Sequence, residues 1–428
     1  MQVGPGPRSK FFYGWTIVLV GAILTFLGTG FYSYSRGVFL PSLAEELAAG
    51  SRFAIAMGFS IAAVTSAVLA PFLGKVLDSF SPRKVILIGI AIVSISYLLL
   101  AVCQTLWQFY LIIGIGMGTG MSCMGNLAWH RTIISWFDHW RGRAIALGVL
   151  GASLAGVVMP PLVTAMVAEI GWRSSFAIFA IIVMSLLTPL VYYLLKDRPE
   201  EIGEVRDGKA YRSKLTDIRA SSESEDRLWH WREMLRTPAF WSIGMMFGAM
   251  GCVYSATMLH LFGHLKDIDL SGSEAAYVLS ITALFAALGK PAVGWMADAL
   301  GARITIWIAL IVHVIGLLLF SFGSGFVMSL IAGGIYGFGY AGMSPLRSFS
   351  LSVAIGNRSF GAANGVLRLG ELPLVISASP LAGYIYDTTG SYRIAFLILA
   401  GLMLVCCIGP FFIKAGGARQ RALNSSPA

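Results

Sequence analysis

Charged residues are scarce in this sequence. Only 12% of its 428 residues are Asp, Glu, Lys or Arg, whereas 57% are hydrophobic and the mean hydropathy is +0.76. A soluble domain carries about twice that charged fraction. Apolar runs long enough to cross a hydrocarbon core of ~30 Å recur along the whole chain. The scarcity of charge therefore excludes an ordinary soluble protein and indicates a polytopic membrane protein.

Cysteines and catalytic motifs are also few. The five cysteines lie in or at the ends of apolar segments without a metal-ligand spacing, which is typical of small buried hydrophobes. We find no His-rich cluster, nucleophile motif or phosphate loop, so we expect no enzyme activity, no catalytic residues, no cofactor and no metal site. The net charge of +10 comes from loop residues that set membrane orientation, and it indicates no nucleic-acid partner.

The apolar segments predict an all-α membrane protein. The first segment follows only Arg8 and Lys10 and has no small-residue cleavage site, so we interpret it as a retained helix and not as a cleaved signal peptide. Twelve transmembrane helices are expected, at residues 12–35, 53–77, 84–103, 107–130, 142–168, 173–195, 239–263, 274–297, 303–323, 327–346, 360–386 and 392–414.

The loop cations predict the orientation of the chain in a plasma (inner) membrane. With the N-terminus inside, fourteen cations fall on the cytoplasmic side and five on the outer side, which indicates that both termini are cytoplasmic. The cytoplasmic set is Arg8, Lys10, Lys75, Arg83, Lys84, Arg131, Arg141, Arg143, Arg303, Arg347, Arg358, Lys414, Arg419 and Arg421. The outer set is Arg36, Arg52, Arg173, Lys266 and Arg393.

The longest polar insertion, Lys196 to Arg236, separates the sixth and seventh expected helices. Its charged, Ser-rich composition is typical of a solvated linker. Its end, from Leu228 to Arg236, places Trp and Leu beside Arg and favours an amphipathic helix on the inner membrane face, although a regulatory docking site is an alternative. We therefore expect an N-terminal six-helix bundle at 1–196, a cytoplasmic linker at 197–237 and a C-terminal six-helix bundle at 238–428.

The two halves contain a repeat. The loop Gly74-x3-Asp78-x4-Arg83 matches Gly294-x3-Asp298-x4-Arg303 at an offset of 220 residues. Three further matches follow at an offset of 219, namely Gly142 with Gly361, Gly151 with Gly370 and Pro161 with Pro380. Offsets of half the chain predict two six-helix bundles of the same topology, related by a parallel pseudo-two-fold repeat.

The repeated loop and the Gly/Pro-rich fifth and eleventh helices resemble those of the major facilitator superfamily over essentially the whole chain. The resemblance implies alternating access around a central site between the bundles. Ser79 and Ser81 depart from the superfamily pattern in the first loop copy. Pairing of the loop acids with neighbouring arginines predicts either a latch on the cytoplasmic side or static surface pairs. These gating candidates are Asp78, Arg83, Arg141, Arg143, Asp298, Arg303 and Arg358.

A few charges fall inside expected membrane helices, where each costs about 2.5–3.5 kcal/mol on insertion scales. Lys290 lies eight residues before Asp298, or about 12 Å from the cytoplasmic end at 1.5 Å per residue. Arg368 is expected at a similar depth, and both are candidates to bind an anion. Glu371 follows Arg368 by three residues, so it is expected either to neutralise that arginine or to carry a coupled proton.

Other polar residues in the membrane segments are weaker candidates. His260 and His264 are possible proton sites because imidazole titrates near neutrality, whereas His313 is interpreted as structural. Helix packing is the alternative explanation for the remaining polar side chains. These candidate substrate hydrogen-bond donors are Asn126, Tyr254, Tyr336 and Tyr340.

Several stretches are similar to the monocarboxylate porter family and its oxalate/formate antiporter relatives. They are Tyr13-Gly14-Trp15, Tyr32 to Phe39, a looser match from Trp136 to Arg143, and Gly289-Lys290-Pro291. The resemblance implies that Arg36 takes the place of a family lysine and Lys290 that of the substrate-pairing arginine. Ala286 stands where many members carry an acid, so Glu371 or a histidine is needed for proton coupling.

These observations favour a secondary active transporter of a small organic anion, most of all a monocarboxylate. Coupling by proton symport and by exchange for a counter-anion both remain open, and a functional monomer in the lipid bilayer is expected. The alternatives are a proton-coupled exporter of lipophilic or cationic compounds, which needs more acidic residues than Glu371 alone, and a transporter-like membrane sensor, for which the linker is short.

Overall fold

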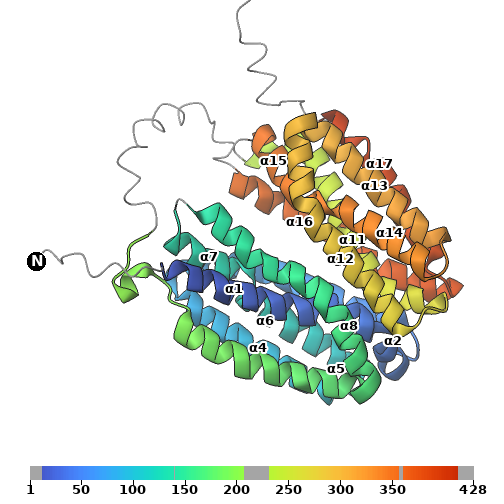
Figure 1. The fold of residues 1–428 in the computed structure, drawn as a ribbon, viewed down its shortest axis with the longest axis horizontal. Helices are drawn as coiled ribbons and strands as arrows, with labels where there is room; N and C mark the ends of the chain where they lie inside the picture. The colour runs from blue at the N-terminus through green and yellow to red at the C-terminus, as the bar shows by residue number, and fades with distance from the viewer. Residues whose placement is uncertain (1–11, 139, 207–230, 356–359, 413–428) are drawn as a thin grey trace, which may run out of the picture. The chain divides into compact units, whose positions relative to one another are not determined.

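The computed structural model describes residues 12–138, 140–206, 231–355 and 360–412, and the regular elements in these ranges are helices (Figure 1). In chain order they are α1 (Gly14–Thr29), η1 (Gly30–Tyr34), α2 (Arg36–Leu47), α3 (Arg52–Ser79), α4 (Pro82–Ala101), α5 (Leu106–Phe109), η2 (Tyr110–Met117), α6 (Gly118–Met124), α7 (Asn126–Trp136), α8 (Arg141–Ile182), η3 (Val183–Leu187), η4 (Leu190–Leu194), η5 (Pro199–Ile202), α10 (Trp231–Leu235), α11 (Pro238–Asp267), α12 (Gly272–Leu300), α13 (Ala302–Phe322), α14 (Phe326–Ala341), α15 (Met343–Ile355), α16 (Phe360–Thr389), α17 (Arg393–Cys406) and η6 (Gly409–Phe412).

The predicted all-helical membrane architecture is confirmed. Eleven helical stretches in the described part of the chain are long and apolar enough to cross a membrane. One of them, Arg141–Leu194, has 54 residues and contains two of the expected spans. The backbone turns between those two spans at Gly171, where φ is 76° and ψ is 165°, a conformation that glycine adopts without steric cost.

Two expected spans differ from the sequence prediction. The fourth was expected at 107–130 but extends from Leu106 to Trp136, and it is interrupted at Gly125, whose extended ψ of −169° ends α6 and starts α7. The tenth was expected at 327–346, but α14 ends at Ala341 and a separate helix, α15, follows. α15 carries Arg347, which the sequence analysis had placed in a cytoplasmic loop.

Residue contacts divide the chain into two compact units. Unit 1 contains residues 1–34, 61–155 and 169–224, and unit 2 contains residues 35–60, 156–168 and 225–428. Unit 2 therefore includes two segments from the first half of the sequence. Side-chain hydrogen bonds hold them there, from Ser60 Oγ to the Ile376 carbonyl oxygen (2.7 Å) and from Ser280 Oγ to the Val157 carbonyl oxygen (2.7 Å). The boundaries at 196 and 238 that the repeat suggests stay a prediction.

Within unit 2, α12 packs against α14 (Figure 1). Glycines at their contact allow a close approach. A Cβ atom on Gly337 would lie 2.1 Å from the carbonyl oxygen of Thr282, and one on Gly289 would lie 2.6 Å from the Cβ atom of Ala341. Small residues allow membrane helices to approach at backbone distance, where dispersion contacts hold them together. The glycines thus fix the position of α12, the helix that carries Lys290.

We predict that Gly337→Ala destabilises the protein, because the new methyl group collides with backbone atoms of α12 that cannot move independently. Overpacking of this kind costs typically ~1–3 kcal/mol, which lowers the unfolding temperature of the purified protein by several degrees. The matched control is Gly401→Ala in α17, where a Cβ atom meets nothing within 4 Å. Equal thermal stability of the two variants would show that the α12–α14 contact is not tight.

Candidate functional site

Lys290 lies in the second half of α12, ten residues before the helix ends at Leu300, and its side chain is half-buried. The residue beside it, Gly289, contacts Ala341 and Phe338 of α14. The structure therefore brings the α12 backbone at Lys290 close to the end of α14, where Tyr340 precedes Ala341 in sequence. The expected depth of Lys290 in the membrane stays a prediction.

Three candidate tyrosines come together beside this contact. The rings of Tyr254 on α11 and Tyr340 on α14 are stacked, with their centroids 3.6 Å apart and an interplanar angle of 8°. Tyr336 lies nearly parallel to Tyr254 at 6.3 Å. Tyr336 is fully buried and donates to the Val253 carbonyl oxygen (3.3 Å), whereas the other two rings are only partly buried. Tyr254 and Tyr340 are therefore the two of this group with accessible surface for a ligand.

Arg36 begins α2 and does not lie in an outer loop. Its Nη2 atom donates to the backbone oxygen of Ser255 (3.1 Å) and to Ser255 Oγ (2.9 Å), so the guanidinium group lies against α11 one residue from Tyr254. The same group stands 6.0 Å from the ring of Phe59. Arg36 and Tyr254 belong to unit 2, whereas Asn126 belongs to unit 1, where it is exposed at the start of α7.

Glu371 pairs with Arg347 of α15, whereas one of the two expectations from the sequence paired it with Arg368. Arg347 Nη1 donates to Glu371 Oε2 (3.0 Å), and Arg347 Nη2 lies 3.0 Å from Oε1 as an ion contact without hydrogen-bond alignment. The two side chains are 11% and 10% exposed. Arg368 is exposed on α16, and the direct ion pair of the buried carboxylate is made with α15.

Sequence reasoning missed Arg347 because the tenth helix was expected to end at residue 346, which left Arg347 in the loop after it. The signal that was available is the spacing of apolar residues around it. Leu346, Leu351 and Ile355 are all buried, which gives α15 an inward face. α11 accommodates the pair through Gly248, where a Cβ atom would lie 2.5 Å from Glu371 Cγ.

His260 is fully buried and both ring nitrogens have partners. Nε2 is 2.8 Å from the Ser379 carbonyl oxygen, which can only accept, so Nε2 carries the proton. Nδ1 is then the acceptor for the Tyr392 hydroxyl at 2.9 Å in a neutral imidazole. Burial raises the pKa of Tyr392, so that hydroxyl keeps its proton. These contacts favour a structural role for His260 over the proton-coupling role that the sequence suggested.

His264 and His313 are also buried. His264 Nε2 donates to the Phe320 carbonyl oxygen (2.9 Å). His313 packs its ring 4.3 Å from that of Tyr336, and neither of its nitrogens has a hydrogen-bond partner among the residues that the structure describes. The interpretation of His313 as a packing residue of α13 fits this position.

The gating loops are described in part. Asp298 is exposed near the end of α12, and Arg303 lies 5.1 Å from the ring of Phe411. Arg143 is exposed and lies 4.2 Å from the ring of Trp140, and Arg141 is exposed as well. Arg358 and the side chain of Asp78 lie outside the described residues, so the latch on the cytoplasmic side stays a prediction.

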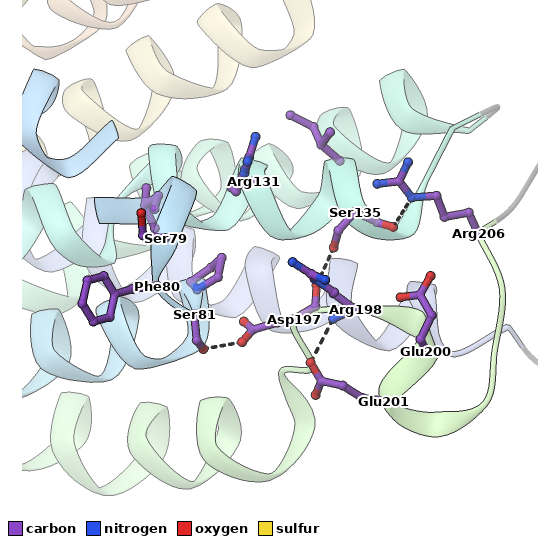
Figure 2. Close-up of a pocket in the computed structure, with 13 residues that line it drawn as sticks. Ser79, Phe80, Ser81, Arg131, Ser135, Asp197, Arg198, Glu200, Glu201 and Arg206 are labelled. Atoms are coloured by element: carbon purple, nitrogen blue, oxygen red, sulfur yellow. Dashed lines mark hydrogen bonds between the residues drawn. The ribbon is translucent and has the colours of Figure 1, made fainter. Parts of the chain in front are cut away.

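The start of the linker binds the first loop copy, which sequence reasoning did not anticipate. A cavity of about 540 Å³ in unit 1 is bounded by the α3–α4 loop, by α7 and by residues 197–206 (Figure 2). Asp197 accepts hydrogen bonds from Ser81 Oγ and from the Arg83 backbone nitrogen, so it caps α4. Arg206 donates to the Ser135 carbonyl oxygen (2.7 Å). Ser81, a departure from the superfamily pattern, thus acts as an anchor for the linker.

Part of the linker end is also described. The expected amphipathic helix from Leu228 to Arg236 corresponds to α10, Trp231–Leu235. Residues 228–230 of the expected helix lie outside the described part of the chain. Within it, Met234 is fully buried. The proposed position on the membrane face stays a prediction.

Comparison with known proteins agrees with this architecture. The sequence matches the Major Facilitator Superfamily (MFS_1) over residues 22–265 and 261–427. It is 25% identical to an uncharacterized MFS-type transporter, YcxA, of Bacillus subtilis, over 95% of this chain and 97% of that protein. It is 24% identical to monocarboxylate transporter 13 of Bos taurus (92% and 87% covered) and to monocarboxylate transporter 1 of Mus musculus (93% and 85%).

Solved structures show the same fold. A bacterial homolog of the human lysosomal transporter Spinster, in an inward-facing and unoccupied conformation, aligns with a TM-score of 0.70 at 17% identity, over 99% of this chain and 100% of that one. The nucleoside transporter NupG aligns with a TM-score of 0.68 at 14% identity, over 94% and 98%. The family match covers nearly the whole sequence, and the predicted fold is confirmed. The chain is therefore a multi-pass membrane transporter that belongs to the Major Facilitator Superfamily.

Proposed function

We propose that this transporter carries a small organic anion, most of all a monocarboxylate, and that Lys290 binds the carboxylate. The observation that carries the proposal is a half-buried lysine well inside the apolar helix α12. Residues that are charged inside the membrane are costly to insert and mark substrate or ion pathways. The stacked, partly buried Tyr254 and Tyr340, from α11 and α14, supply hydroxyl groups in the same unit.

The relatives named as monocarboxylate transporters support the anion class, and the chemistry of lysine refines it. An ammonium group is a compact point charge, whereas arginine grips a carboxylate with two parallel hydrogen bonds. Lys290 therefore favours small anions whose remaining contacts come from hydroxyl groups and apolar surface. A drug-type exporter of cations needs free acidic groups in the membrane, and Glu371 is already neutralised by Arg347.

We further propose that the Arg347–Glu371 pair couples transport to protons. A buried ion pair is stable only while both charges are present, because removal of one leaves the other uncompensated in a low dielectric. Protonation of Glu371 leaves the guanidinium group of Arg347 without its anion, so a substrate carboxylate then binds more strongly in this unit. In anion exchange, the incoming counter-anion binds in place of the substrate carboxylate. Proton and substrate thereby bind together.

The membrane orientation belongs to the same proposal. Cations are in excess in the loops on the same side of the membrane as the linker, which supports cytoplasmic termini in the inner membrane. The repeat of two bundles around one central site supports a functional monomer.

Lys290→Ala is predicted to abolish carboxylate uptake into proteoliposomes, because the variant removes the anchoring charge without altering the close packing at Gly289. Lys290→Arg is expected to retain uptake, since the charge remains. The control is Lys266→Ala, an exposed lysine at the end of α11. Unchanged uptake kinetics in Lys290→Ala, with normal membrane insertion, would contradict the anion-site proposal.

Glu371→Gln is predicted to lose uphill uptake driven by a pH gradient, because the amide cannot exchange a proton, while counterflow of labelled substrate persists. Uptake should be measured with and without an imposed gradient, acidic outside. The control is Glu274→Gln at the start of α12, where glutamine preserves the capping box with Ser271. Full gradient-driven accumulation in Glu371→Gln would rule out this carboxylate as the proton carrier.

A further inference from the structure

The start of α3 is bound to two helices of the second half of the sequence through one arginine. Arg52 Nη1 donates to Asp267 Oδ2 (2.9 Å) and Nη2 donates to Oδ1 (3.1 Å), which is a bidentate pair with the end of α11. The guanidinium group lies 3.7 Å from the centroid of the Tyr386 ring on α16. Tyr386 in turn donates to Asp267 Oδ1 (3.3 Å), so the three side chains form one closed set.

A second acid from α16 caps α3. The carboxylate of Asp387 accepts hydrogen bonds from Ser51 Oγ (2.7 Å) and from the backbone nitrogens of Arg52 (2.9 Å) and Phe53 (3.1 Å). These nitrogens are the first donors of α3, which have no partner inside the helix and lie at its positive end. The cap of α3 therefore comes from another helix, and it is lost if α3 and α16 separate.

Backbone packing reinforces the same contact. A Cβ atom on Gly383 of α16 would lie 2.7 Å from the Phe53 backbone nitrogen, so the two helices touch without an intervening side chain. Arg52 also lies 5.2 Å from the ring of Tyr392, whose hydroxyl group meets the buried His260. The contacts thus continue from the surface into the interior of unit 2.

We infer that this Arg52 latch, made of Arg52, Asp267, Tyr386 and Asp387, holds the outer end of the transporter closed. In transporters built from two repeats, access alternates because one half rocks against the other. α3 comes from the first half and α11 and α16 come from the second, so opening at this end must break the bidentate pair, the stacked ring and the cap together. This role is independent of the proposed substrate and of Lys290.

The latch is tested by the reactivity of a cysteine behind it. Ser60→Cys places a thiol two turns further along α3, where Ser60 is 4% exposed and bonds to α16. The variant is made in a background whose five native cysteines are alanine, and the rate of reaction with a membrane-impermeant maleimide added from outside is measured. Arg52→Ala and Asp267→Asn are each expected to raise that rate about five-fold, the factor given by loss of one partly exposed pair.

The double variant distinguishes a latch from two separate effects. If Arg52 and Asp267 act as one contact, the double variant reacts no faster than either single variant. The matched control is Arg393→Ala, an arginine at the same end that lies 4.4 Å from the Phe322 ring, within the second half. Its rate should equal that of the parent. Arg52→Lys keeps the charge but loses the bidentate geometry, so it is expected to give an intermediate rate. It replaces Arg52→Ala in the test if Arg52→Ala inserts poorly into the membrane.

Equal rates in the parent and in both single variants would overturn the latch, as would an equal increase in Arg393→Ala. A double variant whose effect is the product of the single effects would also contradict it. The measurement needs no substrate. An increased rate that persists in a Lys290→Ala background supports the latch whether or not the anion-site proposal holds, because the two variants then act on different steps.

Discussion

The cost of a charge in a low dielectric governs most of what is specific in this protein. The membrane interior supplies neither water nor counter-ions, so each charge within a spanning helix must find a partner or serve a ligand. Glu371 on α16 and Arg347 on α15 form such a pair, with 3.0 Å between Oε1 and Nη2. Arg52 and Asp267 pair at the start of α3 and the end of α11, where the two side chains are 11% and 27% exposed. The helices that bear these charges are positioned by small residues, since glycines at the contacts of α11, α12 and α14 leave room for the side chains and backbones opposite.

These pairs also suggest how transport and conformation are linked. An ion pair that joins separate helices is a two-state contact, because a change in either partner leaves the other charge uncompensated. In the proposed scheme the Arg347–Glu371 pair responds to protons and substrate, and the Arg52 latch responds to the movement of α3 against α11 and α16. Both lie in unit 2, and α11 contacts both. Its Gly248 lies beside Glu371, and its Asp267 pairs with Arg52.

The sequence predicted the features that depend on composition and repetition. Long apolar segments located the membrane helices, and the offset of 220 residues between Asp78 and Asp298 indicated the duplication. The distance from Lys290 to that loop gave its expected depth in the membrane, which stays a prediction. The fourth and tenth helices were less well predicted, because a glycine such as Gly125 interrupts a helix without changing its hydropathy.

Partners that are distant in sequence could not be predicted in this way. Arg347 lies in a Gly- and Pro-containing stretch, and its pairing with Glu371 depends on how α15 folds back onto α16. The same holds for Asp197, whose role as the cap of α4 requires the linker to return to the first loop copy. Helix periodicity reports which face of a helix is buried but not which helix covers it.

The central claim, that this transporter recognises the negative charge of a small acid, is tested most directly by competition between a monocarboxylate and its uncharged amide in proteoliposomes. The two compounds have nearly the same size and shape, so only the charge distinguishes them. If the negative charge is recognised, the acid inhibits uptake of a labelled monocarboxylate and the amide does not. Equal inhibition by both, or preferential transport of a cationic compound, would contradict it.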